Sequence, residues 1–452
     1  MRVSRYNIFI EQDSYVLGFN ALTGAFARID RDMYAKYHQI SDKELDVNDP
    51  EVEAFIEDLK KGGFIIEDNF DELDYLKVRH FASRFGSRHL SLTVAPTLDC
   101  NFGCPYCYEP DKRAEYMTRE VEDKLVDYIT QRLENISTLS VSWFGGEPTL
   151  ALDTMCRLSE KFRKKAAENE VKYSEEIITN GYNLTKEVAL RIKNLGDNIS
   201  GAQVTVDGPP EIHDVRRPLT NGGRTFDVIM NNLQDIAGNI LPVVLRVNLD
   251  EKNFFAFPKL LEILKQRGLA KRLHVYVAQT DVGAGSCQSA SDYGVDVPQF
   301  AKLETEAQRI LLDKGFVMYT TIKPNFVSCL AVCANRVVIT PKGDIHRCWR
   351  GIDNPRERSG NLFEPATINK NETKWLAWNP FERTKCRNCY VLPLCMGGCP
   401  YKSVEIEGQP AVAESDRCYS VKYNVRELLK SQYRQYQMQK MATSKEGRIE
   451  VR

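Results

Sequence analysis

The sequence lacks any long apolar run. No stretch of its 452 residues approaches the about 18 consecutive apolar residues that a membrane-spanning helix needs. The N-terminus, Met1 to Tyr6, has no apolar core of the kind found in signal peptides. A strong charge of either sign is also missing, because the formal net charge is −1. We therefore expect a cytoplasmic protein with neither a membrane nor a nucleic acid among its partners.

Cysteine, by contrast, is abundant, with 13 in the chain. Disulfides are rare in cytoplasmic proteins, so this many cysteines indicate metal binding or catalysis. All but two of them fall in spaced clusters. Cys156 lies in an apolar helical stretch and is expected in the core, whereas Cys287 lies in a small polar loop and is expected to be a spare thiol.

The first cluster follows an apolar run over residues 90–98, with the spacing Cys100-x3-Cys104-x2-Cys107. Three soft thiolates on one short loop can hold three irons of a 4Fe–4S cluster. No fourth cysteine lies nearby, so one iron stays open to chelate a small molecule and pass it an electron. A zinc site is the alternative, although structural zinc usually takes four ligands arranged as two pairs.

Tyr106 precedes the last cysteine of this cluster, and a Tyr-Glu pair follows it. With these neighbours the loop resembles the signature of the radical SAM superfamily, whose open iron binds S-adenosylmethionine (SAM). The resemblance implies that Cys100, Cys104 and Cys107 hold the catalytic cluster and that Tyr106 contacts SAM. An electron from a donor such as flavodoxin or ferredoxin would then cleave SAM to methionine and a 5′-deoxyadenosyl radical.

Strands and helices alternate regularly between residues 89 and 315. The expected strands are 90–96, 139–144, 176–180, 203–206, 243–249 and 273–277, and the helices that follow them are 119–135, 150–168, 186–195, 225–236, 257–267 and 297–314. Strands and helices of these lengths form parallel βα units, and six units make an α/β fold with a partial (β/α)6 TIM-like barrel. Active-site residues are then expected at the C-terminal ends of the strands, where the first cysteine loop begins.

The second strand ends in Trp-Phe-Gly145-Gly146-Glu147-Pro. Glycines let the backbone approach a ligand closely, and a carboxylate suits an amino group. Alone this could be a tight turn, but one βα unit after the cysteine loop it resembles the element that holds the methionine amino group of SAM. By the same resemblance Thr205, at the end of the fourth strand, contacts the sugar of SAM, and Arg217 faces its carboxylate. His213, between them, is expected to brace the loop.

A second set of cysteines begins at residue 329. Its central pattern, CxxCxxxxxCxxxC, resembles the SPASM domain that carries auxiliary 4Fe–4S clusters in radical SAM enzymes, with zinc-ribbon-like sites as the alternative. The resemblance implies three 4Fe–4S clusters in all, and either Cys329 or Cys333 could prove free and leave the nearer auxiliary cluster open. The implied ligands are Cys329, Cys333, Cys348 and Cys399 for the nearer auxiliary cluster, and Cys386, Cys389, Cys395 and Cys418 for the outer one.

The remaining segments divide the chain further. Residues 1–68 read as strands and helices that resemble the winged-helix peptide-recognition element of enzymes that modify ribosomal peptides, with a structural cap over the barrel as the alternative. A polar linker helix is expected over 69–88, the barrel over 89–315 and the SPASM domain over 316–420. The segment 421–452 is expected to be a surface helix with a loose end.

Together these resemblances predict a radical SAM maturase that installs a crosslink, most simply a thioether, in a ribosomal precursor peptide with a leader. The alternatives are a peptide C–C or C–O cyclase and an anaerobic sulfatase-maturing (formylglycine-generating) enzyme. The sulfatase-maturing family has an aspartate after the third auxiliary cysteine, whereas Trp349 follows Cys348 here. An iron–sulfur electron carrier without substrate chemistry would need neither an open iron nor the Gly-Gly-Glu turn.

Overall fold

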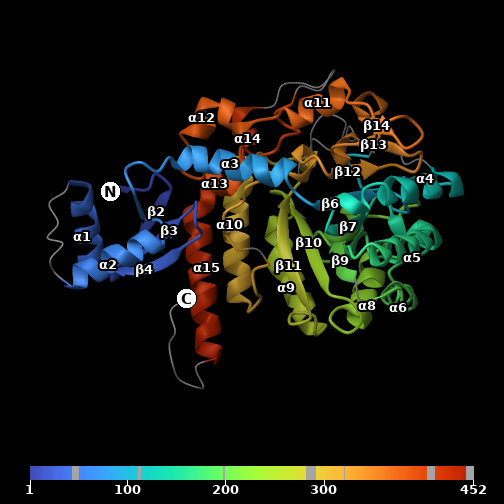
Figure 1. The fold of residues 1–452 in the computed structure, drawn as a ribbon. Coiled ribbons are helices and arrows are strands. Elements are labelled where there is room, and N and C mark those ends of the chain that lie inside the picture. Colours follow the sequence, from blue (N-terminus) through green and yellow to red (C-terminus); the bar gives the residue numbers. More distant parts are fainter. Residues whose placement is uncertain are drawn as a thin grey trace.

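The central feature of the computed structural model is a long, mostly parallel sheet with helices packed along it (Figure 1). The structure describes residues 1–42, 50–109, 114–196, 199–280, 292–319, 321–404 and 413–443. Within them the strands of this sheet follow the order β11-β10-β9-β8-β7-β6-β12-β13-β14. The expected position of Cys287 and the end of the tail lie outside the described residues.

Six parallel strands form the barrel part of the sheet, each at its predicted place. They are β6 (His89–Val94), β7 (Thr138–Trp143), β8 (Lys172–Thr179), β9 (Ile199–Thr205), β10 (Val243–Leu249) and β11 (Leu273–Gln279). The helices between and after them are α4 (Arg119–Thr130), α5 (Leu152–Glu168), α6 (Lys186–Lys193), α7 (Pro210–Arg216), α8 (Phe226–Ile236), α9 (Phe257–Gln266) and α10 (Val297–Asp313). Only α7, a helix of under two turns, was not expected as a separate element.

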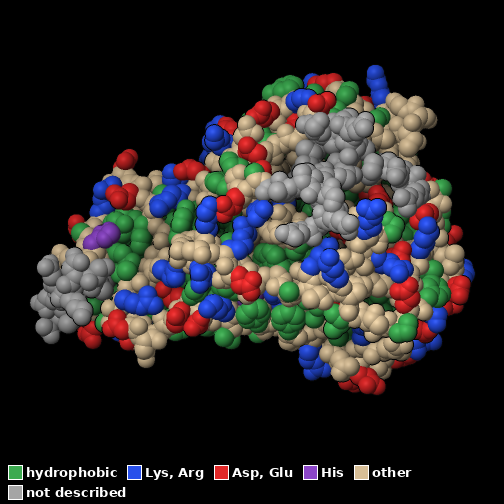
Figure 2. Space-filling model, turned by 90° about the horizontal axis from the view of Figure 1, so that it is seen from above, with side chains coloured by type: hydrophobic (Ala, Val, Ile, Leu, Met, Phe, Trp, Pro, Cys, Tyr) green, Lys and Arg blue, Asp and Glu red, His purple; other side chains and the backbone are tan. Residues whose placement is uncertain are grey.

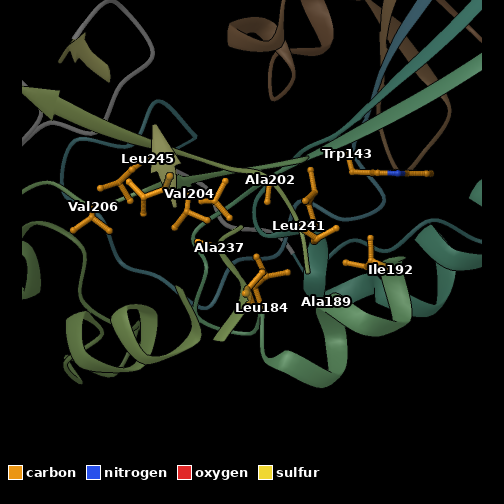
Figure 3. Packing of buried hydrophobic residues seen from close by; sticks show 14 of the residues in the cluster. Trp143, Leu184, Ala189, Ile192, Ala202, Val204, Val206, Ala237, Leu241 and Leu245 are labelled. Atoms are coloured by element: carbon orange, nitrogen blue, oxygen red, sulfur yellow. The ribbon is translucent and has the colours of Figure 1, made fainter. Parts of the chain in front are cut away.

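Apolar side chains fill the space between the sheet and its helices. Val204 of β9 and Leu245 of β10 belong to the same buried cluster as Ala189 and Ile192 of α6, and all four are labelled in Figure 3. In β6 and β7 buried residues alternate with partly buried ones, so each strand buries one face fully and the other in part. Cys156, on α5, is buried as predicted.

The sheet does not end at the barrel. Strand β12 (Arg336–Ile339) pairs in parallel with β6, and β13 (Asp344–His346) and β14 (Gly360–Asn361) add to it in antiparallel fashion. The apolar β12, which lies in the segment predicted to be the SPASM domain, covers the edge of β6 that an open barrel would leave unpaired. Short helices complete this region: α11 (Lys370–Leu376), α12 (Thr384–Arg387), α13 (Leu392–Cys395) and α14 (Glu414–Arg417).

The N-terminal residues form the predicted small α/β unit. Strands β2 (Asn7–Glu11), β3 (Tyr15–Asn20) and β4 (Phe26–Asp30) make an antiparallel sheet, followed by α1 (Arg31–Asp42) and α2 (Pro50–Lys61), while β1 (Arg2–Val3) pairs with β5 (Ile65–Ile66). Leu17 and Phe19 share one buried cluster with Leu392, Val425 and Leu429. The unit therefore packs on C-terminal segments, and both its role in peptide recognition and the alternative of a structural cap stay untested predictions.

The linker helix α3 (Glu72–Phe85) is not merely a polar connection. Arg84, only 1% exposed, donates hydrogen bonds to the carbonyls of Val332, Leu376 and Trp378 at 2.8 Å each. His80 bonds to the carbonyl of Phe326 at 2.7 Å. These contacts fasten α3 across the C-terminal region, so its buried polar residues hold two parts of the chain together.

The last helix, α15 (Val421–Thr443), is likewise more than a surface helix. Gln435 accepts a hydrogen bond from the Met318 N–H at 2.6 Å, and Gln432 accepts one from Ile322 at 2.7 Å. Tyr433 packs against Tyr15 and Phe26 of the N-terminal sheet. The helix bridges the N-terminal unit and α10, which explains its position between them in Figure 1.

The surface matches the near-neutral composition. Basic and acidic side chains are intermixed over the face seen in Figure 2, without a broad area of one sign. Among the described residues, no helix is both long enough and apolar enough to cross a membrane.

Candidate active site

The first cysteine loop follows β6 and is pinned by the segment after α7. Phe102 and Leu219 form an antiparallel bridge, and the Gly103 N–H donates to the Pro218 carbonyl at 2.8 Å. Cys104 is buried, and Cys100 and Cys107 are half-buried. The loop therefore lies at the C-terminal end of its strand, as predicted, with its three thiols held by backbone contacts.

The Gly-Gly turn after β7 lies directly against the start of this loop. A Cβ atom on Gly145 would come within 2.3 Å of the Thr97 carbonyl oxygen, and one on Gly146 within 2.2 Å of the Asp99 oxygen. Gly145 also has φ +121°, which disfavours other residues. Here the glycines serve the close approach of two strand-end loops, which sets the position of the cysteine loop.

Glu147 is fully buried, and its carboxylate is occupied by the chain itself. It accepts hydrogen bonds from the Thr149 N–H at 3.1 Å, the Thr149 and Thr179 hydroxyls at 2.5 and 2.7 Å, and the Asn180 N–H at 2.7 Å. Burial raises the pKa of Glu147, and these bonds oppose that rise. The carboxylate therefore ties the ends of β7 and β8 together, and its contact with the SAM ammonium stays a prediction.

Tyr106 and Arg217, both predicted to contact SAM, meet in one buried network. Arg217 Nη1 donates to the Tyr106 hydroxyl at 2.8 Å, and that hydroxyl donates to Asp207. Burial raises the pKa of Tyr106 strongly. Burial alone would lower the pKa of Arg217, but Tyr106, Cys104 and Asp207 together raise it. Arg217 Nε is buried without a hydrogen-bond partner, so one donor of the guanidinium is left for a ligand.

Asp207, Arg216 and Asp250 belong to this network and were not singled out from the sequence. Arg216 bonds Asp250 at 2.8 Å, and its guanidinium lies 5.1 Å from the ring centre of Tyr106. Asp207 also accepts the Asn248 N–H at 3.0 Å. Asp207 stands in the Thr-Val-Asp-Gly run at the end of β9, and a carboxylate at a strand end was the available signal.

Two further predictions concern the end of β9. Thr205 is buried there beside Arg246 of β10, as its strand position required. His213 accepts the Asp207 N–H at its Nδ1 (3.2 Å) and lies 3.1 Å from the Thr225 hydroxyl through Nε2. Burial lowers the pKa of His213 to about 3. The expected bracing role of His213 is confirmed.

The second cysteine set separates into two groups. Burial is the largest cause that raises the pKa of Cys329, to about 11, and the charges of Cys399 and Cys333 raise it further. Burial likewise raises the pKa of Cys348, and the charges of Cys329 and Cys399 add to the rise. In the other group Cys418, Cys389 and Cys386 act on Cys395, whose pKa is about 12. These couplings agree with the two groups that the resemblance implied, and the binding of a cluster by each group stays a prediction.

No three Cys, His, Asp or Glu side chains of the described residues converge closely enough to hold one metal ion. The thiolates of a 4Fe–4S cluster bind separate irons, so they do not need to meet at a single point.

The first loop and the nearer cysteine group adjoin each other. Ile352 packs with Ala95 and Leu98, at the entry to the cysteine loop. Burial is the largest cause that raises the pKa of Tyr108, followed by the charge of Glu109. The charges of Cys107 and of Cys348 both raise this pKa further, so both thiols lie near Tyr108. The pairing of β12 with β6 thus brings the auxiliary region to the C-terminal ends of the barrel strands.

Comparison with known proteins agrees with this site. Residues 94–275, which include the cysteine loop and the Gly-Gly turn, match the family model of the radical SAM superfamily. The radical SAM cyclopropyl synthase TigE of Paramaledivibacter caminithermalis is 20% identical over 94% of this chain and 95% of its own. A serine-type anaerobic sulfatase-maturating enzyme of Klebsiella aerogenes is 22% identical over 67% of this chain and 77% of its own.

Two solved structures have the same fold. The anSMEcpe structure with bound AdoMet and Cp18Cys peptide has a TM-score of 0.58 at 18% identity and covers 77% of this chain and 98% of its own. Streptococcus suis SuiB bound to precursor peptide SuiA has a TM-score of 0.53 at 13% identity and covers 88% and 95%. The chain belongs to the radical SAM superfamily. It is an enzyme, related to sulfatase-maturating and peptide-modifying enzymes.

Proposed function

We propose that this enzyme binds SAM at a 4Fe–4S cluster on Cys100, Cys104 and Cys107, carries two auxiliary 4Fe–4S clusters, and installs a thioether crosslink in a ribosomal precursor peptide. The observation that carries the proposal is the junction between the first cysteine loop and the Cys348 group. A peptide at the barrel mouth would lie within reach of both. Solved structures of the same fold contain SAM and peptides, which supports this substrate class.

The residues present fit these cofactors. Three thiols on one pinned loop suit an open-iron cluster, and the spare Nε of Arg217 suits the carboxylate of SAM. Cys329, Cys333, Cys348 and Cys399 would hold the nearer auxiliary cluster; Cys386, Cys389, Cys395 and Cys418 would hold the outer one. When bound, the first cluster and SAM supply a 5′-deoxyadenosyl radical, and the protein's task is to position the peptide and exclude water.

Atoms and electrons balance in the formation of the crosslink. A peptide carbon loses one hydrogen atom to the radical, a cysteine thiol of the peptide loses its proton, and a C–S bond forms. One electron is left over, and we assign it to the nearer auxiliary site. The peptide therefore loses two hydrogens for each 5′-deoxyadenosine that forms.

The N-terminal unit is proposed to bind the leader of that peptide in the manner of a winged-helix recognition element. Strands β2 and β4 are the end strands of its sheet, and an extended peptide can add to such an edge through main-chain hydrogen bonds. Because the unit shares its core with residues near Leu392 and Leu429, its deletion would disturb the fold. Calorimetric titration of the intact protein with a leader peptide is the appropriate test.

A C–C bond-forming cyclase is the second candidate, because the cyclopropyl synthase relative aligns over nearly the whole chain. Treatment of the product with iodoacetamide separates the two candidates. A thioether consumes the peptide's thiol and blocks alkylation, whereas a C–C product keeps it reactive. Formylglycine formation would be recognised by an aldehyde that reacts with hydrazide reagents.

The experiment uses reconstituted enzyme, reductant, SAM and a synthetic peptide translated from a short cysteine-containing reading frame beside the gene. We expect 5′-deoxyadenosine together with a peptide that has lost two hydrogens and no longer alkylates. Formation of 5′-deoxyadenosine with an alkylatable product would overturn the thioether and leave the cyclase. Absence of 5′-deoxyadenosine under all conditions would contradict the proposed function itself.

A further inference from the structure

The segment that follows Cys348 is firmly placed beside the first cysteine loop. Ile352 packs with Ala95 and Leu98, and the Gly351 N–H donates to the Cys348 carbonyl at 3.2 Å. The stacking of Trp349 on Phe144, which directly follows β7, places this segment at the C-terminal end of the barrel strands. The side chains between Cys348 and Ile352 therefore stand where the barrel and the auxiliary region meet.

Trp349 is the first of these side chains, and it is exposed. It retains 46% of its surface, whereas the other three tryptophans of the chain, Trp143, Trp375 and Trp378, retain 2%, 1% and 8%. Its ring stacks on Phe144 with 5.8 Å between the centres and 30° between the planes. Phe144 directly precedes Gly145, at the C-terminal end of β7, so the indole extends an aromatic surface from the predicted SAM turn.

Leaving an indole half in water forgoes hydrophobic stabilisation, on the order of 1 kcal/mol for each 40 Å² of apolar surface. Large exposed aromatics are instead typical of recognition surfaces, because they offer contact area with few rotatable bonds. A peptide bound above the C-terminal ends of the strands would cover this surface.

We propose that Trp349, supported by Phe144, binds the segment of the precursor peptide that carries the reacting carbon. This inference rests on the proposed function and names the residue that holds its substrate. The matching partner is an apolar or aromatic side chain, or a peptide plane, stacked on the indole. The residue would thus position the peptide between the first cysteine loop and the Cys348 group.

Fluorescence gives a direct test that requires no turnover. Trp349 is the only strongly exposed tryptophan, so acrylamide quenching of the intact, reconstituted protein should report mainly on it. Addition of the synthetic precursor peptide should lower the quenching constant at least twofold. A scrambled peptide should leave it unchanged, and Trp349→Phe should remove both most of the quenching and the response. Peptide binding detected by calorimetry with no change in quenching would overturn the proposal.

Coupling between SAM cleavage and crosslinking gives the second test. Trp349→Ala should lower the crosslinks formed per 5′-deoxyadenosine at least tenfold and raise KM for the peptide, and Trp349→Phe should restore most of both. Phe363→Ala is the matched control, since Phe363 is 44% exposed in the same region, and it should change neither. An unchanged ratio in Trp349→Ala would refute the assignment. Failure of the wild-type enzyme to form 5′-deoxyadenosine would instead contradict the proposed function.

Discussion

The two cysteine regions of this chain are held in place in different ways. The Cys100 loop follows strand β6. Backbone contacts hold it against Gly145 and Gly146, which follow β7, and against Pro218, which follows α7. The second region has only short strands and helices, and buried side chains from a distant helix, such as Arg84 of α3, hold it. Local backbone geometry therefore positions the first site, and long-range polar contacts position the second.

The largest effect is expected from Gly146→Ala. Its Cβ would lie 2.2 Å from the Asp99 oxygen, so the cysteine loop must move. We expect SAM cleavage to fall at least a hundredfold, with a loss of about four of about twelve irons. Gly360→Ala, in the second region, is the control because its nearest neighbour would be 3.8 Å away. Normal SAM cleavage by Gly146→Ala would show that the close approach is dispensable.

Arg84→Met should have the next largest effect. It leaves three buried carbonyls without a donor, at about 1 kcal/mol or more each, so the stability should fall by about 3 kcal/mol. The first site should retain its iron while the auxiliary irons, about eight, become labile. Thermal unfolding and iron analysis measure both, with the exposed Arg79→Met of the same helix as control. Loss of iron from all sites alike would contradict the separation of the two regions.

Glu147→Gln should have a smaller effect and act first on stability. A glutamine would turn an amide N–H toward donors such as Asn180 or Thr149, which costs about 1 to 3 kcal/mol. The melting temperature should fall even without SAM. Glu175→Gln removes a similarly buried carboxylate away from the loop and should lower stability without changing SAM affinity. An unchanged melting temperature together with weakened SAM binding would indicate that Glu147 contacts SAM and does not stabilise the strand ends.

The smallest effect concerns pH. Burial lowers the pKa of His80 and of His346, both in contact with the second region, to about 4 from the ordinary 6.5. Between these two pKa values the unfolded chain binds protons that the folded chain does not. The contribution of the neutral histidines to the free energy of unfolding is therefore fully present above pH 6.5 and is lost as the pH falls toward 4. Between pH 7 and 6 the loss should be under about 1 kcal/mol per histidine. His80→Gln should flatten this dependence; an equal slope would contradict it.

Much of the first region could be predicted from the sequence, because its signals are local. Strand β10 has the predicted bounds, Val243–Leu249, because most of its residues are apolar and only Arg246 and Asn248 interrupt them. The role of Glu147 could not be read in this way, because its partners Thr179 and Asn180 lie on the next strand. The packing of two strand ends gives Glu147 a structural role, and its contact with SAM, implied by the resemblance, stays a prediction.

The second region shows the limits more clearly. The resemblance implied the two groups of cysteines, but no local pattern indicated that β12 would join β6 or that α3 and α15 would bury polar side chains. Trp349 appeared only as a departure from another family's motif. Its stacking on Phe144 depends on contacts between residues more than two hundred positions apart, which sequence periodicity does not encode.

We infer that the Cys100 loop alone performs SAM cleavage. The decisive measurement is of 5′-deoxyadenosine and iron in the reconstituted variant with Cys100, Cys104 and Cys107 all changed to alanine, beside the wild type. We expect about eight irons in place of about twelve, and no 5′-deoxyadenosine. Continued formation of 5′-deoxyadenosine by the triple variant would contradict it.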